Sequence, residues 1–203
     1  MKVVLHFIHF TTIEGGNVLK TITKSLRILD TLNNNPTKDD LKTALLSLNI
    51  EYEDVESELK TSENKPYYRK LLYQNKDVEL LVMNWSQLEC APHDHGSSQG
   101  WIKVLNGSTK NTVYELEENG LPRELFTKNH DKDQVLFAPK HGVHKMKAEE
   151  NSDLVTLHLY SPPISGMKVY DLEKCSVCVV SDDCGAWWPD EQRQKLREIQ
   201  LNA

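Results

Sequence analysis

The stretch CAPHDHGSSQGWIKVLNG, residues 90–107, contains two histidines separated by a single residue, His93 and His95. In an extended chain, residues i and i+2 point to the same side, so both imidazoles can converge on one ion. Taken alone, the pair is equally compatible with surface histidines or with histidines that make structural hydrogen bonds. A metal site therefore needs a further partner elsewhere in the chain.

A second group of polar side chains lies in TLHLY, residues 156–160. On a strand, Thr156, His158 and Tyr160 would share one face, and Leu157 and Leu159 would face the other way. Three polar groups on one face need either solvent or a polar cavity. Read alone, an open sheet facing water is the better interpretation; beside a histidine metal site, a polar cavity is.

The elements that must position these residues change type along the chain. Leucines and isoleucines at helical spacing, with Thr37 as an N-cap, predict a helical part at about 17–50. Short segments rich in β-branched and aromatic residues then predict a β-barrel at about 66–185. PDEQRQKLREIQL predicts a C-terminal helix at about 189–201. We expect one domain over residues 1–203, mainly β.

Composition excludes several classes of partner. With 24 Lys and Arg against 30 Asp and Glu, the formal net charge is -6, which argues against nucleic acid or an anionic membrane surface. No apolar stretch approaches a membrane span. The four cysteines and the lack of an export signal predict reduced thiols in a cytoplasmic protein. Structural zinc is not expected at C-x2-C-x5-C, which lacks a fourth ligand and holds Cys175, Cys178 and Cys184.

The spacing of the histidines resembles the two cupin motifs. The first motif has His-x-His followed by Glu, and here His93 and His95 fit while Gly100 stands where the Glu would be. The second motif ends in a histidine, which PKHGVH places at His144. His141 lies three residues earlier, and strand alternation turns it to the opposite face. The resemblance implies a jelly-roll-like barrel with three histidines from two strands and no carboxylate.

Four segments together resemble the cysteine dioxygenase family, in its order: YYRKLLYQN (67–75), HDHGSSQGWIKVLNG, HGVH and TLHLYSPP (156–163). The similarity covers roughly residues 60–170. A neutral set of three imidazoles also suits Fe(II) that must bind an anionic thiolate and leave a position for oxygen. The resemblance therefore implies an Fe(II) cofactor.

The resemblance implies a role for each matching residue. The iron ligands would be His93, His95 and His144. The substrate carboxylate would be held by Arg69, whose planar fork can bind both oxygens, with Tyr67 beside it. The active-site tyrosine would be Tyr160, oriented by a hydrogen-bond relay through His158 and Thr156. Trp85 lies near the family's pocket tryptophan, one residue short in its spacing to the first histidine.

Two further expectations come from the same family. Mammalian members carry a cysteine at the Gly100 position, joined to the tyrosine as a thioether. Glycine here matches bacterial members, so we expect no Cys–Tyr crosslink. The family's Ser-Pro bond after the tyrosine is cis, and we expect the same for Ser161–Pro162.

The residues and the resemblance together predict an iron(II) thiol dioxygenase that oxidises L-cysteine with O2 to cysteine sulfinic acid. The sibling activity, 3-mercaptopropionate dioxygenase, is an alternative, although that branch tends to replace the early arginine, which Arg69 retains. A non-catalytic cupin that binds metal as a sensor is a second alternative, which would not require Arg69, His158 and Tyr160. A cupin isomerase is weaker still, because those enzymes usually keep the missing Glu. We expect a monomer.

Overall fold

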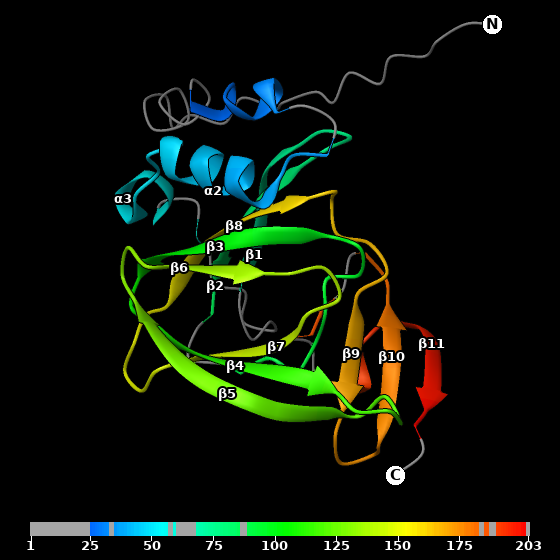
Figure 1. Cartoon of the computed structure of the whole chain (residues 1–203). Helices are drawn as coiled ribbons and strands as arrows, with labels where there is room; N and C mark the ends of the chain where they lie inside the picture. Colours follow the sequence, from blue (N-terminus) through cyan, green and yellow to red (C-terminus); the bar gives the residue numbers. More distant parts are fainter. Residues whose placement is uncertain are drawn as a thin grey trace, which may run out of the picture.

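The computed structural model describes residues 25–32, 35–56, 59, 68–85, 89–182, 185–186 and 190–201. Tyr67, Cys184, Pro189 and the first part of the predicted N-terminal helix lie outside the described residues. The described chain runs through short helical segments, a series of strands and a final strand near the C-terminus (Figure 1).

The helical segments near the N-terminus are short. They are η1 (Leu29–Thr31), α2 (Lys38–Ser47) and α3 (Tyr52–Val55). Thr37 caps α2 as expected: its hydroxyl accepts the Asp40 N–H, and the Asp40 carboxylate accepts the Thr37 N–H at 2.9 Å. This reciprocal capping box satisfies backbone donors that the first turn leaves open.

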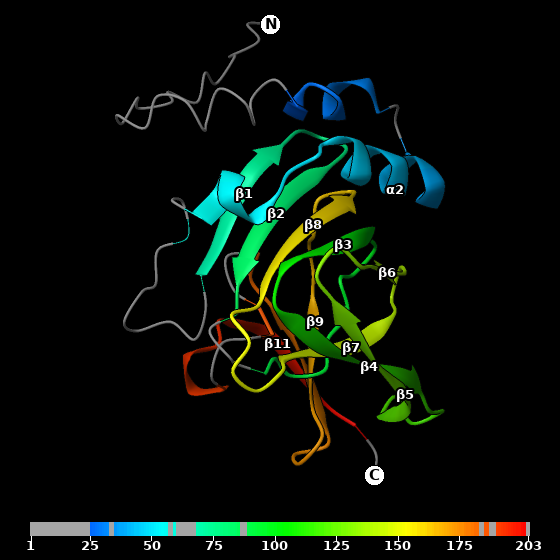
Figure 2. The same ribbon diagram turned by 90° about the vertical axis from the view of Figure 1, so that its left-hand side faces the viewer.

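The largest sheet has five strands in the order β1-β2-β8-β3-β6. Their bounds are β1 (Tyr68–Gln74), β2 (Glu79–Asn84), β3 (Gln99–Asn106), β6 (Val135–Ala138) and β8 (Val155–Ser161). Each neighbouring pair is antiparallel. Strand β8 therefore lies at the centre, and all seven of its residues are buried. Figure 2 shows α2 above this sheet.

Two three-stranded sheets complete the fold. One has the order β5-β4-β7, with β4 (Ser108–Leu116), β5 (Pro122–Asp131) and β7 (Val143–Ala148). The other has the order β11-β10-β9, with β9 (Lys168–Asp171), β10 (Ser176–Val180) and β11 (Lys195–Gln200). The sheet with β4 and β7 faces the five-stranded sheet across the barrel (Figure 1).

The segment that carries His93 joins the two smaller sheets. His93 and His144 exchange backbone N–H···O bonds of 2.9 and 3.0 Å, which attaches the segment to β7. On its other side, Asp94 N–H donates to Lys168 O, and Tyr170 N–H donates to Pro92 O, both in or beside β9. The histidine segment is thus extended and held from both sides, although it is not one of the named strands.

Side chains of β2 and β8 alternate between two cores. Leu80, Val82, Leu157 and Leu159 pack with the α2 leucines on the outer face of the large sheet. Leu81, Met83 and Tyr160 belong to a second cluster, inside the barrel. The alternation expected for TLHLY is confirmed: its two leucines face the helices, because burial of apolar area fixes the register of the strand.

The predicted C-terminal helix at about 189–201 is wrong. The structure has a short 3-10 turn, η3 (Asp190–Gln192), followed by β11, which pairs antiparallel with β10 from Ser176↔Gln200 to Val180↔Lys195. Leu196 is 70% exposed, so the apolar spacing read as a helix face buries little. The open edge of β10 offers backbone partners that decide the conformation instead.

Other expectations about the fold are confirmed. The chain has a mainly β cupin fold, a double-stranded β-helix, with short N-terminal helices. The Ser161–Pro162 bond is cis. That residues 1–203 form one domain stays a prediction.

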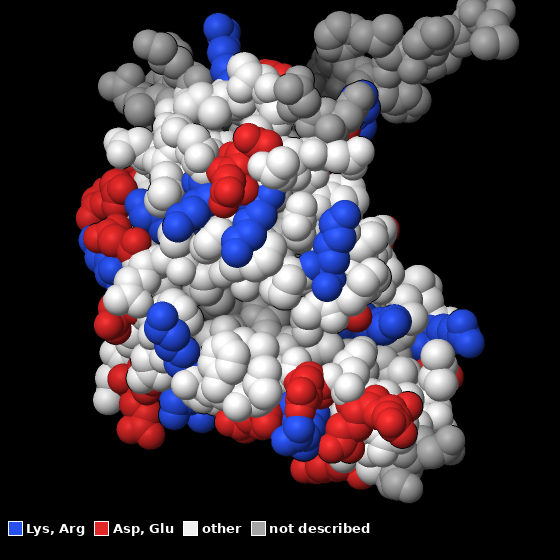
Figure 3. Space-filling view, viewed as in Figure 1, with Lys and Arg blue, Asp and Glu red and all other residues white. Residues whose placement is uncertain are grey.

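The surface carries both signs of charge. On the face seen in Figure 3, Lys and Arg side chains are interspersed with Asp and Glu, in keeping with the mild negative net charge. None of the described helices is long and apolar enough to cross a bilayer.

At Gly100, β3 lies close against β8. A Cβ placed there would lie 2.3 Å from the Leu159 carbonyl oxygen and 2.4 Å from Cδ1 of Tyr160. Backbone cannot yield as a side chain can, so we predict that Gly100→Ala lowers the free energy of unfolding by about 3 kcal/mol. Urea denaturation measures it. Gly166→Ala is the control: a Cβ there meets nothing within 4 Å, and its positive φ alone should cost about 1 kcal/mol. Equal costs for both variants would contradict the close approach.

Candidate active site

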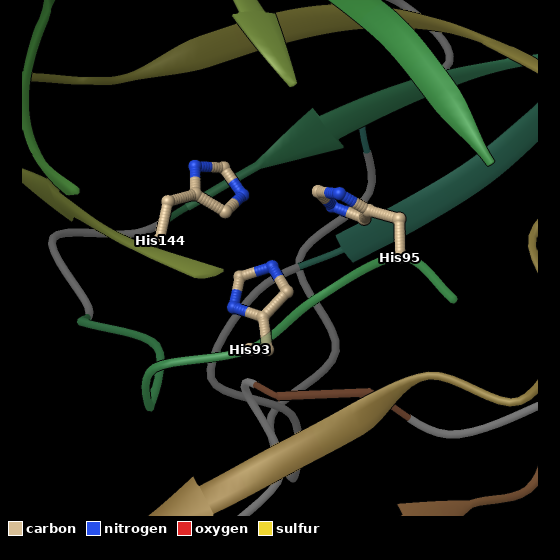
Figure 4. Close-up of side chains that lie close together, drawn as sticks. All are labelled: His93, His95 and His144. Carbon is tan, nitrogen blue, oxygen red and sulfur yellow. The ribbon is translucent and has the colours of Figure 1, made fainter. Parts of the chain in front are cut away.

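Three buried histidines converge inside the barrel. Each offers a ring nitrogen, and these atoms all lie within 4.8 Å of one another. The ring centroids are 5.1 Å apart for His93 and His95, 4.7 Å for His93 and His144, and 5.0 Å for His95 and His144. Figure 4 shows the rings pointing toward a common centre, two from the segment before β3 and one from β7. This is the three-histidine metal site that the sequence predicted.

Two of the three rings are oriented by partners outside the centre. His93 Nδ1 lies 2.9 Å from the Ala91 carbonyl oxygen, and His144 Nδ1 lies 2.9 Å from Asn111 Oδ1. Both partners are acceptors, so Nδ1 of each ring must carry the proton. Nε2 of each ring then keeps its lone pair for a ligand bond. Such partners fix both tautomer and orientation of metal-bound imidazoles.

The three histidines are held neutral. Burial lowers the pKa of His93, and burial followed by the neighbouring histidines lowers the pKa of His95 and His144 well below its usual range. Buried polar atoms without a partner are rare, yet His95 Nδ1 and His144 Nε2 have none among the described residues. Neutral imidazoles with uncommitted nitrogens are what a transition-metal ion requires, so these residues fit one.

A hydrogen-bonded chain of side chains leads from the barrel interior to the histidines. Trp85 Nε1–H donates to Thr156 Oγ1 at 2.7 Å, and Thr156 Oγ1 lies 2.6 Å from His158 Nε2. His158 Nδ1 lies 3.0 Å from the Tyr160 hydroxyl, which lies 3.2 Å from His95 Nε2. The sequence predicted the three members on β8 at period two. Trp85, which the sequence placed near the family's pocket tryptophan, donates the first hydrogen bond of this chain.

The first bond of this chain has a direction fixed by its donor, and both titratable members of the chain are held neutral. An indole N–H can only donate, so the Thr156 hydroxyl accepts from Trp85, and its remaining sites pair with His158 Nε2 in a direction that the tautomer of His158 sets. Burial lowers the pKa of His158 to about 3, so the ring is neutral and carries a single proton. Burial also raises the pKa of Tyr160 well above its usual range. The phenol therefore keeps its proton, and its hydroxyl lies between His158 Nδ1 and His95 Nε2.

Arg69 and the histidines line one cavity. Arg69 enters from β1, opposite Met83 of β2, and its side chain is 28% exposed. The same cavity is lined by the three histidines, by His158 and Tyr160, by the polar residues Ser181 and Asp182, and by mostly apolar side chains: Leu81, Met83, Trp85, Met146, Ile164 and Met167. A guanidinium at the edge of an apolar cavity, with a neutral metal site inside it, suits a small ligand with a carboxylate at one end.

The structure brings together nearly all residues that the sequence singled out. Tyr67 lies outside the described residues, so its predicted place beside Arg69 is untested. His141 is exposed in the turn before β7, while His144 is buried on β7, so the expected choice of His144 is confirmed although strand alternation is not its cause.

Two residues at the site were not predicted. Asn111 of β4 contacts His144 across 33 positions in the chain. Glu79, at the start of β2, is 3% exposed and lies beside Arg69. The signal for Glu79 was a carboxylate heading the apolar run VELLVM; Asn111 gave none.

The cysteines form no second metal cluster among the described residues. Cys175 lies in the turn before β10, Cys178 is buried on β10, and the histidine trio is the single group there with metal-binding spacing. Cys90 is buried 3.7 Å from His93 Nδ1, and burial raises its pKa to about 12. A protonated thiol packed there acts as a small apolar side chain.

Comparison with known proteins agrees with this geometry. The family model for cysteine dioxygenase type I matches residues 28–173, more than half of the chain. Cysteine dioxygenase type 1 of Rattus norvegicus is 24% identical over 142 residues, covering 60% of this chain and 70% of that protein. The Danio rerio and Homo sapiens proteins are each 25% identical, over 112 and 111 residues, and the chain spans about half the length of both, 56%.

Solved structures resemble the barrel more distantly. An uncharacterized conserved protein with a double-stranded β-helix domain from Klebsiella pneumoniae is 17% identical, with a TM-score of 0.45 over 57% of this chain and 87% of that one. KdgF from Halomonas is 21% identical, with a TM-score of 0.39 over 51% and 84%.

The extent of the family match, together with three histidines in one buried centre, leads to one conclusion. The chain belongs to the cysteine dioxygenase type I family.

Proposed function

We propose that this protein is an Fe(II)-dependent thiol dioxygenase that converts L-cysteine and O2 to cysteine sulfinic acid. The observation that carries the proposal is the shared cavity: Arg69 and Tyr160 line the same space as the three histidines. In the reaction the thiol sulfur is oxidised to the sulfinic state, O2 is the oxidant, and both of its oxygen atoms end on sulfur.

The metal would be held by His93, His95 and His144. Bound Fe(II) would supply the redox chemistry that joins O2 to a thiolate. Imidazole ligands suit iron, and the lack of a carboxylate leaves the ligand set uncharged, which favours an anionic thiolate substrate.

The chain's own residues would bind the substrate and hold protons. Arg69 would bind the carboxylate through two parallel N–H···O bonds, fixing the distance between that end and the histidine centre. Tyr160 would offer its hydroxyl proton at the centre, aimed there by His158 and Thr156. The buried relay holds the phenol in one orientation before substrate arrives, which is the usual contribution of positioned polar groups.

Tyr160 would be held without a thioether. Gly100 leaves no sulfur at the position that mammalian family members use, and the Tyr160 ring packs directly over the glycine. We infer that this contact and the bond from His158 replace the crosslink in fixing the ring.

Two alternatives to the L-cysteine dioxygenase function differ in how well they fit the residues at the site. A 3-mercaptopropionate dioxygenase would share the fold and metal site, but retention of Arg69 favours L-cysteine. A metal-binding cupin sensor would not need the relay to Tyr160. The monomeric state and the cytoplasmic location stay predictions.

Oxygen consumption tests the function directly. Fe(II)-loaded protein is given L-cysteine and 3-mercaptopropionate in parallel, and the product is identified by NMR. We expect cysteine sulfinate from L-cysteine and little turnover of the analogue. A preference for 3-mercaptopropionate would assign the sibling activity, and no uptake with either thiol, at full iron content, would leave a metal-binding cupin.

Arg69→Ala should separate substrate binding from metal binding. Loss of a bidentate charged contact, worth about 3 kcal/mol, should lower kcat/KM for L-cysteine about 100-fold while iron content stays the same. Steady-state oxygen uptake and iron analysis measure both. Arg123→Ala is the matched control, because Arg123 is exposed on β5 and paired with Glu115. Unchanged turnover in Arg69→Ala would remove Arg69 from the site.

Asn111→Leu should weaken the metal site without removing a ligand. It deletes the acceptor that fixes the His144 tautomer, and loss of such a partner typically weakens metal affinity about 10- to 100-fold. Competition with a chromophoric chelator measures the dissociation constant for Fe(II) under argon. Asn129→Leu, an exposed asparagine on the neighbouring strand, should leave it unchanged. Equal affinity in the two variants would show that Asn111 does not orient His144.

A further inference from the structure

Glu79 is a buried carboxylate that no step above uses, and it lies beside two residues that line the cavity. It opens β2, is 3% exposed and stands opposite Tyr160 of β8 in the sheet register. Isolated buried carboxylates are costly, so each oxygen needs a partner. Oε1 accepts the backbone N–H of Ile164 at 2.9 Å, and Oε2 lies 3.9 Å from Arg69 Nη2.

The two partners of Glu79 both belong to the cavity wall. Arg69 and Ile164 line the cavity, the first from β1 and the second from the loop after β8. One buried carboxylate therefore contacts both the arginine of the cavity and the loop after β8 that lines it. The side chain of Glu79 has little freedom, because the Ile164 N–H fixes one oxygen and burial prevents exchange with water.

Arg69 needs such an anchor. It lies on β1, an edge strand of the large sheet, and its long side chain reaches a partly exposed position. An arginine side chain at such a position can adopt several rotamers, and only one of them can place two N–H groups of the guanidinium on the same carboxylate. At 3.9 Å, the Glu79 oxygen attracts the guanidinium electrostatically without forming a hydrogen bond, so the N–H groups stay available to a ligand.

We propose that Glu79 is a positioning residue that holds the Arg69 guanidinium at the mouth of the cavity, and thereby sets the preference for thiols that carry a carboxylate. The inference rests on the proposed function, because it assigns Arg69 to the substrate carboxylate. The inference makes a statement about substrate class: binding of thiols that carry a carboxylate depends on Glu79, and binding of thiols without a carboxylate does not.

Glu79→Gln isolates the charge. Glutamine keeps a carbonyl oxygen that can accept the Ile164 N–H, and it removes the negative charge beside Arg69. Binding is measured by calorimetry under argon on Fe(II)-loaded protein, with L-cysteine and with cysteamine, which has the same thiol and amine but no carboxylate. We expect five- to tenfold weaker L-cysteine binding and unchanged cysteamine binding. Glu115→Gln, an exposed partner of Arg123, should change neither.

A double-mutant cycle with Arg69→Ala tests whether Glu79 acts through Arg69. In the Arg69→Ala background, Glu79→Gln should have no further effect on L-cysteine binding. Equal losses for L-cysteine and cysteamine would mean a general structural role and overturn the proposal. Tighter L-cysteine binding in Glu79→Gln would also overturn it, since Glu79 would then compete with the substrate.

The binding assay keeps this inference separable from the proposed function. Absence of oxygen uptake by the wild-type protein would overturn the proposed dioxygenase function, whatever the binding assay shows. The ratio of L-cysteine to cysteamine binding decides the role of Glu79 without any turnover. Wild-type protein that bound L-cysteine no better than cysteamine would overturn the role of Glu79.

Discussion

The interior of the barrel contains three imidazoles buried close together, and this burial constrains their protonation and hydrogen bonding. A ring that binds a cation needs one nitrogen satisfied by the protein and the other free to accept at the centre; among the described residues, His95 Nδ1 and His144 Nε2 have no hydrogen-bond partner. His93 and His144 meet this condition through Ala91 and Asn111. Protonation would place like charges in a buried space, so the rings are stable there only as neutral groups. A cation at the centre then completes the bonding that the protein leaves open.

Strand β8 shows how one sequence segment serves two opposed requirements. Its leucines hold the large sheet against α2, while Thr156, His158 and Tyr160 form the relay on the opposite face. A shift of one residue in its pairing with β2 and β3 would expose the relay to the helices and bring leucines to the metal centre. Packing on the outer face therefore fixes the chemistry on the inner face.

Residues close together in the sequence were predictable, and contacts across the barrel were not. The His93–His95 pair and the alternation of β8 follow from a period of two, and a family motif located His144. Asn111 comes near His144 only because β4 pairs with β7, a register that the sequence pattern does not reveal. The C-terminal segment was misread for a related reason. Its apolar residues fit a helix, and the open edge of β10, a long-range feature, pairs it as a strand.

The position of Glu79 illustrates why buried charge is informative even when its role is not obvious. A buried carboxylate without a partner has a raised pKa. Burial does raise the pKa of Glu79, and the hydrogen bond from the Ile164 N–H and the charge of Arg69 oppose this shift. The ionised form therefore depends on Arg69 remaining nearby. Conversely, an arginine at the edge of an apolar cavity binds a ligand best when a neighbouring group holds its guanidinium in one position. The two residues occupy neighbouring strands of the same sheet, so the barrel positions the pair before any ligand is present.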